Sequence, residues 1–205
     1  MSIAAGCEGS SAGKRCAPVD EFVAGVVRTT SRTNICPMNA AELRARQAPL
    51  KDLYRHDPAS ARIPIGAHGG FRSPGITCTV EGWAGAMRAG LHPAAGGEES
   101  DACSGDMLLE ALLACAGVTL RSVATALGVD IGEVRLRADG CFDVRGTLGI
   151  DRSTPVGVQD VVITVEVQTD ADEATLERLA ALTERYCVVG QSLRVPPVFA
   201  ILPIQ

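Results

Sequence analysis

The stretch Leu108–Ala124 reads LLEALLACAGVTLRSVA, is the most apolar helical segment of the chain, and carries one thiol, Cys115, at its centre. In helical spacing, nearly all side chains around this thiol are apolar. Its neighbours are Ala111, Leu112, Val118 and Thr119, and the opposite surface carries Leu109, Leu113 and Leu120. A helix that is apolar nearly all round has to be buried on every side, which the centre of a subunit interface achieves more readily than one small domain. We therefore expect an obligate dimer with this helix at its centre.

The residues beside this stretch set the expected bounds of the helix. Ser104 is a candidate N-cap, and Asp106 places a carboxylate in the first turn, where the unpaired amide groups favour it. The apolar pattern continues to Leu127, and the next residue, Gly128, is a typical helix end. The sequence therefore predicts a helix from about residue 104 to Leu127.

The segments around this helix predict strands and helices in an irregular order. Residues 61–93 alternate short apolar stretches with glycine and proline, which is typical of two or three short strands in a small antiparallel sheet. Two longer strands are expected over 133–150 and 156–169, where β-branched residues partly alternate with polar ones. A second amphipathic helix is expected over 170–187, followed by a short helix, a Pro-Pro stop and a closing strand over 188–205. Since strands and helices do not alternate regularly, the predicted fold class is α+β.

The N-terminal segment has a different character. Residues 1–40 mix small and polar residues with isolated cysteines, without a sustained period. We expect them to form a poorly ordered extension with a short strand at Phe22–Val27, ahead of a single domain over 41–205. Because Met38 opens the first clearly helical segment, two starts of the working protein stay open, at Met1 and near Met38.

Composition and charge argue against two classes of partner. The formal net charge is −5, 19 of the 205 residues are basic and 3% are aromatic, which is unfavourable for binding nucleic acid because phosphates need a basic surface and bases need rings to stack on. Uninterrupted apolar runs are shorter than the roughly 18 residues of a spanning helix, and the first residues lack the apolar core of a secretory signal. We expect a cytoplasmic protein without a nucleic-acid or membrane partner.

Eight cysteines stand at positions 7, 16, 36, 78, 103, 115, 141 and 187. They form no CxxC pair and no zinc-type cluster with histidine, and the spacings of Cys78, Cys103 and Cys141 are unrelated. Metal binding is therefore disfavoured, and no metal or other cofactor is expected. In a reducing compartment most of these cysteines are free thiols.

Cys115 by itself permits two interpretations. Free cysteine is among the most buried residue types and behaves there as an inert apolar group. Cys187, however, ends the second amphipathic helix and begins CVVGQSL, and a thiol near a helix N-terminus has its thiolate stabilised. If the fold brings the two together, they form a peroxidatic and resolving pair.

Three stretches resemble the OsmC/Ohr family of osmotically inducible and organic-hydroperoxide-resistance proteins. They are SGDMLLEALLACAGVTL, TERYCVVGQSL and the loop GLHPAAGG before the central helix. The resemblance covers the chain from about residue 60 to the C-terminus. It implies an α+β fold in which two subunits intertwine, with antiparallel sheets packed on long central helices, and a thiol peroxidase activity towards organic hydroperoxides. It also implies a dithiol reductant such as a dihydrolipoyl group.

The resemblance also implies roles for individual residues. By position, Cys115 looks like the cysteine that attacks the peroxide, and Cys187 looks like the one that resolves the sulfenic acid as a disulfide. Active family members also use an arginine that holds the thiolate and an acidic residue that holds the arginine. The candidate arginine is Arg72, in the turn HGGFRSPG, with Arg88 as the second candidate.

Two positions depart from the family pattern. The acidic residue lies ten residues before the cysteine in the hydroperoxide-resistance branch, where this chain has Gly105, and Asp106 follows it. Nine helical residues place Asp106 roughly 13 Å along the axis from Cys115. We therefore expect Asp106 either to serve the partner subunit's Cys115 or to act only as a first-turn helix charge. The residue after Cys187, commonly proline in active members, is Val188.

A second function from another class fits the same residues. A dimeric stress protein or small-ligand-binding protein could keep this fold without catalysis, with the two cysteines serving only as packing. The uptake of organic hydroperoxide by the thiols separates the two functions.

Overall fold

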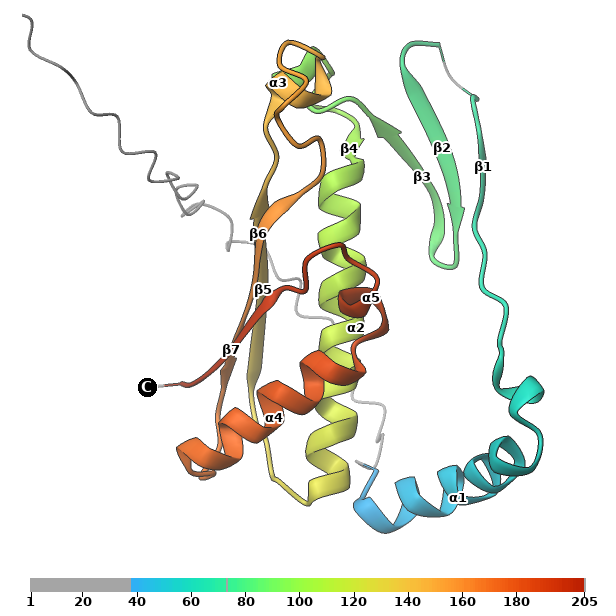
Figure 1. Ribbon diagram of the computed structural model, residues 1–205, viewed down its shortest axis with the longest axis vertical. Coiled ribbons are helices and arrows are strands. Elements are labelled where there is room, and N and C mark those ends of the chain that lie inside the picture. Colours follow the sequence, from blue (N-terminus) through green and yellow to red (C-terminus); the bar gives the residue numbers. More distant parts are fainter. Residues whose placement is uncertain (1–37, 73, 205) are drawn as a thin grey trace, which may run out of the picture.

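The computed structural model describes residues 38–72 and 74–204 (Figure 1). The strand expected at Phe22–Val27 lies outside these residues. The elements in chain order are α1 (Ala40–His56), η1 (Pro58–Ala61), β1 (His68–Gly70), β2 (Thr77–Gly82), β3 (Gly85–Gly90), η2 (Pro93–Ala95), β4 (Ala102–Cys103), α2 (Ser104–Leu127), β5 (Val134–Cys141), α3 (Val144–Thr147), β6 (Gln159–Val167), α4 (Glu173–Tyr186), α5 (Val188–Gln191) and β7 (Val198–Pro203). The predicted α+β class is confirmed.

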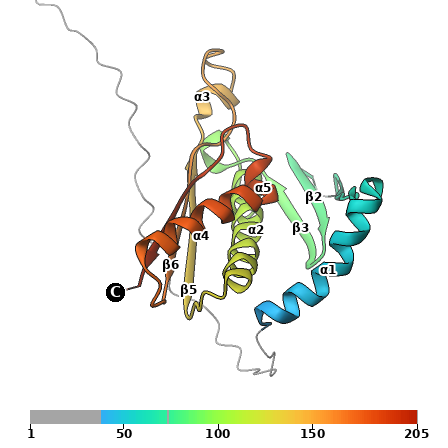
Figure 2. The same ribbon diagram turned by 60° about the horizontal axis from the view of Figure 1, so that its bottom comes forward.

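Two sheets flank the central helix. The first has the strand order β1-β2-β3-β4, with antiparallel pairing except between β3 and β4, which are parallel. The second has the order β5-β6-β7, with an antiparallel β5–β6 pair and a parallel β6–β7 pair. Figures 1 and 2 both show α2 standing between the two sheets, while α4 lies on the same side of β5–β7 as α2 does.

The predicted bounds of α2 are confirmed at both ends, whereas the predicted N-cap is wrong by one residue. Gly128 ends the helix in the left-handed conformation with a φ of 70°, which glycine adopts without steric cost. The N-cap is Cys103 rather than Ser104, and its side chain makes no capping hydrogen bond. The reason is that Cys103 is still extended and pairs with Gly90 of β3, so that α2 begins directly where β4 ends.

The hydrophobic core lies between α2, α4 and the β5–β7 sheet. One face of α2 repeats apolar residues every four positions, and alternate residues of β6 point at it, as the helix and strand periods require. The buried residues of these two elements are Leu112, Ala116, Leu120, Ala124, Ile163, Val165 and Val167. On α4 the buried residues are Leu176, Leu179 and Thr183. This core positions the middle of α2 against the C-terminal end of α4.

Within one chain α2 is buried along one face only. Its opposite face carries Ala111, Ala114 and Val118, and the side chain of Val118 is 73% exposed. By length and composition alone the helix could also cross a membrane, a test that the core helix of a globular protein passes too. Because its other face carries Leu112 and Leu120 in the core, α2 is the central core helix of this fold.

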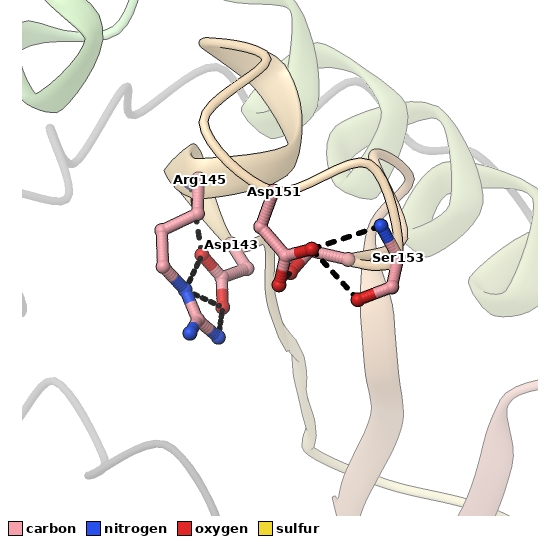
Figure 3. A network of polar contacts seen from close by, with 5 residues as sticks. Asp143, Arg145, Asp151 and Ser153 are labelled. Carbon is pink, nitrogen blue, oxygen red and sulfur yellow. Dashed lines mark hydrogen bonds and ion pairs between the residues drawn. The ribbon is translucent and has the colours of Figure 1, made fainter.

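The strand predicted over 133–150 is wrong in its second half. β5 ends at Cys141, and the chain then forms α3 and a tight loop. The Asp143 carboxylate accepts the Arg145 backbone N–H at 2.9 Å and pairs with the Arg145 guanidinium, and the Asp151 carboxylate accepts the backbone N–H and hydroxyl of Ser153 at 2.9 and 2.7 Å (Figure 3). Aspartate side chains that bond to nearby backbone amides favour turns over strands, which explains the early end of β5.

The N-terminal arm, defined here as residues 38–72 and 74–103, contributes no residue to the hydrophobic core. It holds α1 and the first sheet, and it exposes large apolar side chains. The most exposed are Ile63 (67%), Ile65 (92%), Phe71 (90%), Ile76 (75%) and Trp83 (103%). The two or three short strands predicted within 61–93 are confirmed as β1, β2 and β3.

Candidate redox site at Cys115 and Cys187

The fold brings together two cysteines that lie far apart in the sequence. Cys115 occupies the middle of α2, and Cys187 occupies the junction between α4 and α5, which both pack against α2. Cys187 belongs to the hydrophobic core with 1% exposure, and Cys115 is partly buried against that core. Both are free thiols, and their side chains interact with each other by a hydrogen bond.

Cys187 is fixed in position because it is both the C-cap of α4 and the N-cap of α5. It ends α4 with a φ of −74° and a ψ of 102°, while its N–H still donates to the Thr183 carbonyl at 2.9 Å. Its sulfur then accepts the Gly190 N–H at 3.4 Å and so caps α5. A Cβ atom at Gly190 would lie 3.3 Å from the Cys187 sulfur and 3.6 Å from Leu112 Cδ1. The glycine therefore allows the corner to approach α2 closely.

The surroundings of Cys115 favour its thiolate. Burial raises the pKa of the Cys115 thiol, but hydrogen bonds together lower it by more, so the pKa lies below its ordinary value. The donors are, in order of strength, the Val189 backbone N–H, the Cys187 thiol, the Val188 backbone N–H and the Thr119 hydroxyl. The family resemblance implies an arginine beside this thiol, whereas within one chain the groups that lower its pKa are two amides, a thiol and a hydroxyl.

The pKa of Cys187 is shifted in the opposite direction. Burial raises the pKa of the Cys187 thiol, and the Cys115 sulfur raises it further, because a protonated Cys187 can donate a hydrogen bond to a Cys115 thiolate. The Gly190 N–H lowers the pKa without offsetting these two effects. The pair is therefore asymmetric, because the surroundings favour the thiolate form at Cys115 and the protonated thiol at Cys187.

The two candidate arginines both form ion pairs within the arm. Arg72, between β1 and β2, pairs with Glu81 of β2, and both side chains are well exposed. On β3, Arg88 pairs with Asp101, with Nε 2.6 Å from Oδ1 and Nη2 3.1 Å from Oδ2, and the Asp101 side chain is only 5% exposed. Within one chain the structure thus joins Cys115 to Cys187 and joins each arginine to an acidic residue of its own sheet.

Asp106 lies in the first turn of α2 with an exposed side chain. This is the place expected of a first-turn helix charge. A role towards the partner subunit's Cys115 stays a prediction, since it concerns a second chain.

Sequence reasoning missed two kinds of donor at this site. Thr119 was visible as a polar neighbour of Cys115 one turn further along the helix, which is the signal that identifies it. The amides of Val188 and Val189 were not visible, because the direction of a backbone N–H depends on how the chain turns between α4 and α5.

The comparisons with known proteins bear directly on this arrangement. A family model described as OsmC-like protein matches residues 97–201. The chain belongs to the OsmC-like protein family. Both Cys115 and Cys187 lie inside the matched residues, whereas α1 and β1–β3 precede them. A search of the curated proteins finds no match.

Solved structures share the fold of this OsmC-like chain. An organic hydroperoxide resistance protein from Elizabethkingia anophelis aligns with a TM-score of 0.57 at 14% identity, over 70% of this chain and 98% of that chain. An OsmC-like protein of unknown function from Vibrio cholerae aligns with a TM-score of 0.55 at 15% identity, over 70% and 100%. An OsmC-like protein from Mycoplasma pneumoniae gives 0.55 at 13%, over 69% and 96%. At these identities the likeness concerns the fold.

Proposed function

We propose that this OsmC-like chain is a cytoplasmic thiol-dependent peroxidase that reduces organic hydroperoxides through Cys115 and Cys187. The observation that carries the proposal is the pairing of Cys115 with Cys187, whose opposite pKa directions favour Cys115 as the nucleophile and Cys187 as the proton donor. Family membership and the fold shared with an organic hydroperoxide resistance protein support it. Neither cysteine needs a cofactor for this chemistry.

The proposed reaction follows from the two protonation states. The Cys115 thiolate attacks the distal oxygen of the hydroperoxide, the O–O bond breaks, and Cys115 becomes a sulfenic acid while an alkoxide leaves. The alkoxide takes the proton of Cys187 and becomes an alcohol. The resulting Cys187 thiolate attacks the Cys115 sulfur, the disulfide forms, and hydroxide leaves and is protonated to water. A dithiol such as a dihydrolipoyl group then reduces the disulfide.

A homodimer belongs to the same proposal. The face of α2 with Val118 and the apolar side chains of the arm are exposed in one chain, and a second copy would cover them. In that assembly Asp106 of one chain would serve Cys115 of the other, as expected from its distance along the helix, and Arg72 would be the arginine that the family resemblance implies beside the thiolate. The apolar surface between the copies would accommodate the hydrocarbon part of the substrate.

The sole tryptophan of the chain, Trp83, tests this assembly because its side chain is fully exposed in one chain. We expect its fluorescence emission to shift to shorter wavelength as the protein concentration rises through the dimerisation range, in parallel with the mass measured by sedimentation. A monomer at every concentration would contradict the dimer, as would an emission that stays that of exposed tryptophan in a dimer.

Thiol titration tests the peroxidase itself. Fully reduced protein is mixed with one equivalent of cumene hydroperoxide, and free thiols are counted over time. We expect the wild type to lose two thiols rapidly, Cys115→Ser to lose none at that rate, and the control Cys78→Ser to behave as the wild type. Equal slow loss in wild type and Cys115→Ser would instead support the non-catalytic dimeric stress or ligand-binding protein.

A further inference from the structure

The two sulfurs of the redox site differ in access. Cys187 is 1% exposed and belongs to the hydrophobic core, whereas Cys115 is partly exposed and packs against that core. A disulfide is reduced by a thiolate that attacks one of its two sulfurs, and the access to each sulfur helps to decide which one is attacked. The unequal burial of Cys115 and Cys187 therefore bears on how a disulfide between them would be reduced.

The Cys187 sulfur is enclosed where α5 meets α2. It accepts the Gly190 N–H at 3.4 Å. A Cβ atom at Gly190 would lie only 3.3 Å from this sulfur and 3.6 Å from Leu112 Cδ1 on α2. One added carbon atom would thus crowd the sulfur, and an attacking sulfur atom is larger than a carbon atom. A reductant could reach Cys187 only if α5 first separated from α2.

Cys115 lies at the boundary between the buried and the exposed face of α2. Leu112, three residues before it, and Ala116, directly after it, are fully buried. Ala111, four residues before it, and Val118, three residues after it, are exposed, and residues at these spacings are its neighbours on the helix surface. One side of Cys115 therefore faces the core, and the other faces the open side of the helix.

The proposed peroxidase reaction already needs an opening at Cys115. The hydroperoxide has to reach this sulfur before a disulfide can form. The same opening would admit a thiol that attacks the same sulfur, whereas attack at Cys187 would need a separate path into the core. One entry to Cys115 is therefore sufficient for both halves of the reaction.

The strength of the leaving group acts against attack at Cys115. In thiol–disulfide exchange, the thiol with the lower pKa leaves more readily. The pKa of Cys115 is lowered and that of Cys187 is raised, which by itself favours attack at Cys187. This preference matters only for an attacking thiolate that reaches the sulfur. Because Cys187 is 1% exposed, access outweighs the strength of the leaving group.

We propose that the reductant attacks the Cys115 sulfur of the oxidised pair, so that the mixed disulfide forms at Cys115 while Cys187 stays in the core. The proposal rests on the proposed function, which supplies the disulfide and the dithiol reductant. It assigns to one sulfur both the attack on the hydroperoxide and the bond to the reductant.

The reduction then proceeds in two exchanges. A thiolate of the dithiol attacks the Cys115 sulfur, a new S–S bond forms, and the bond between Cys115 and Cys187 breaks. Cys187 leaves with the electron pair and takes a proton. The second thiolate of the dithiol attacks the reductant sulfur that is bound to Cys115, and Cys115 leaves as a thiolate. The dithiol is oxidised to a disulfide, and both protein sulfurs are reduced.

The test maps the position of the mixed disulfide. The full-length protein is oxidised with diamide, and peptide mass spectrometry first establishes that Cys115 and Cys187 are joined. A brief reaction with the monothiol mercaptoethanol is stopped with acid, which protonates the thiolates and so prevents migration of the adduct. The protein is then unfolded, the freed thiols are alkylated, and fragment spectra locate the adduct.

We expect the adduct at Cys115 to exceed the adduct at Cys187 by about tenfold, because exchange depends on access. The control is the same oxidised protein reacted in concentrated urea, where both sulfurs are accessible and the adduct should divide between them. Equal adducts in the folded protein, or an excess at Cys187, would overturn the proposal. An excess at Cys187 would also show that α5 separates from α2 on oxidation.

Two substitutions in α2 test whether local packing protects Cys187. Leu112→Ala removes the side chain beside Gly190, whereas the matched control Leu120→Ala removes a buried leucine two turns further along the same helix face. We expect the share of adduct at Cys187 to rise in Leu112→Ala and to stay at the wild-type level in Leu120→Ala. An equal rise in both variants would contradict protection by local packing, as would no rise in Leu112→Ala.

The result is separable from the peroxidase proposal because diamide is not a hydroperoxide. If the adduct forms at Cys115 while cumene hydroperoxide causes no rapid loss of thiols, the peroxidase fails and the position of attack stands. If the wild type reacts rapidly with the hydroperoxide and the adduct forms at Cys187, the opposite holds. A protein in which neither oxidant joins the two cysteines would overturn both.

Discussion

The two halves of the described chain differ in how much of their structure they support by themselves. Among the described residues, those of the hydrophobic core all lie within 104–204, including the interior face of α2 and Cys187. The N-terminal arm contains no core residue and exposes Ile65, Phe71 and Trp83. Cys115 and Cys187 lie in residues 104–204, whereas the candidate arginines Arg72 and Arg88 lie in the N-terminal arm. The difference teaches that one chain by itself brings Cys115 and Cys187 together, whereas the apolar side chains of the arm are left uncovered.

The largest effect expected from this contrast is on stability. Leu112 is fully buried and contacts the Cys187 corner, so Leu112→Ala should lower the free energy of unfolding by about 2–5 kcal/mol in urea titrations. Ile65→Ala removes a similar side chain that is 92% exposed, and should cost within about 0.5 kcal/mol if no second copy covers it. A larger, concentration-dependent cost at Ile65 would show that the arm is buried in the dimer, and a small cost at Leu112 would contradict the described core.

The pH dependence of the two thiols is expected to be the next largest effect. The pKa of Cys115 is lowered and that of Cys187 is raised, so alkylation of Cys115 should reach half its maximal rate at a lower pH than alkylation of Cys187. Peptide mass spectrometry after iodoacetamide treatment measures both. If the Cys115 midpoint rises when the protein is diluted to monomers, the arm of a second copy supplies the charge and the contrast between the halves breaks down.

The smallest effect concerns an exposed network within the otherwise well-packed half. Hydrogen bonds from Ser153 and Thr154 lower the pKa of Asp151 to about 2. Because this pKa is depressed, the stabilisation is present above the unfolded value of about 3.9 and is lost as the pH falls through about 2. Asp151→Asn should therefore lower the melting temperature slightly at pH 7. The difference from wild type should vanish near pH 2, and a difference that persisted there would point to a cause other than the carboxylate charge.

Much of the fold could be predicted because its signals are local. Gly128 ends α2 where a residue with positive φ is needed, and the strand periods placed β2, β3 and β6. The failures arose where side chains compete with the backbone pattern, as at Asp143, whose carboxylate bonds to the turn after β5. The N-cap of α2 was misplaced by one residue because Cys103 pairs with Gly90 in a strand, a contact between segments that are separate in the sequence.

The site divides in the same way. The order and contexts of Cys115 and Cys187 were sufficient to suggest a pair, and the structure places them in contact. Which groups favour the thiolate could not be read from the sequence, because the amides of α5 carry no residue signature. Arg72, the arginine expected beside the thiolate, pairs with Glu81 within one chain. Its position relative to Cys115 in an assembly of two copies could not be read from the sequence.

The position of the Cys187 sulfur has a mechanical consequence. The sulfur accepts the Gly190 N–H and so stabilises the first turn of α5. A sulfur that forms a disulfide is a poorer acceptor for that amide. Oxidation of Cys187 to a disulfide should therefore weaken the backbone hydrogen bonding of residues 188–191. Their amide hydrogens should exchange faster after oxidation than before. A reductant that binds here would therefore meet a more mobile segment 188–191 in the oxidised protein than in the reduced one.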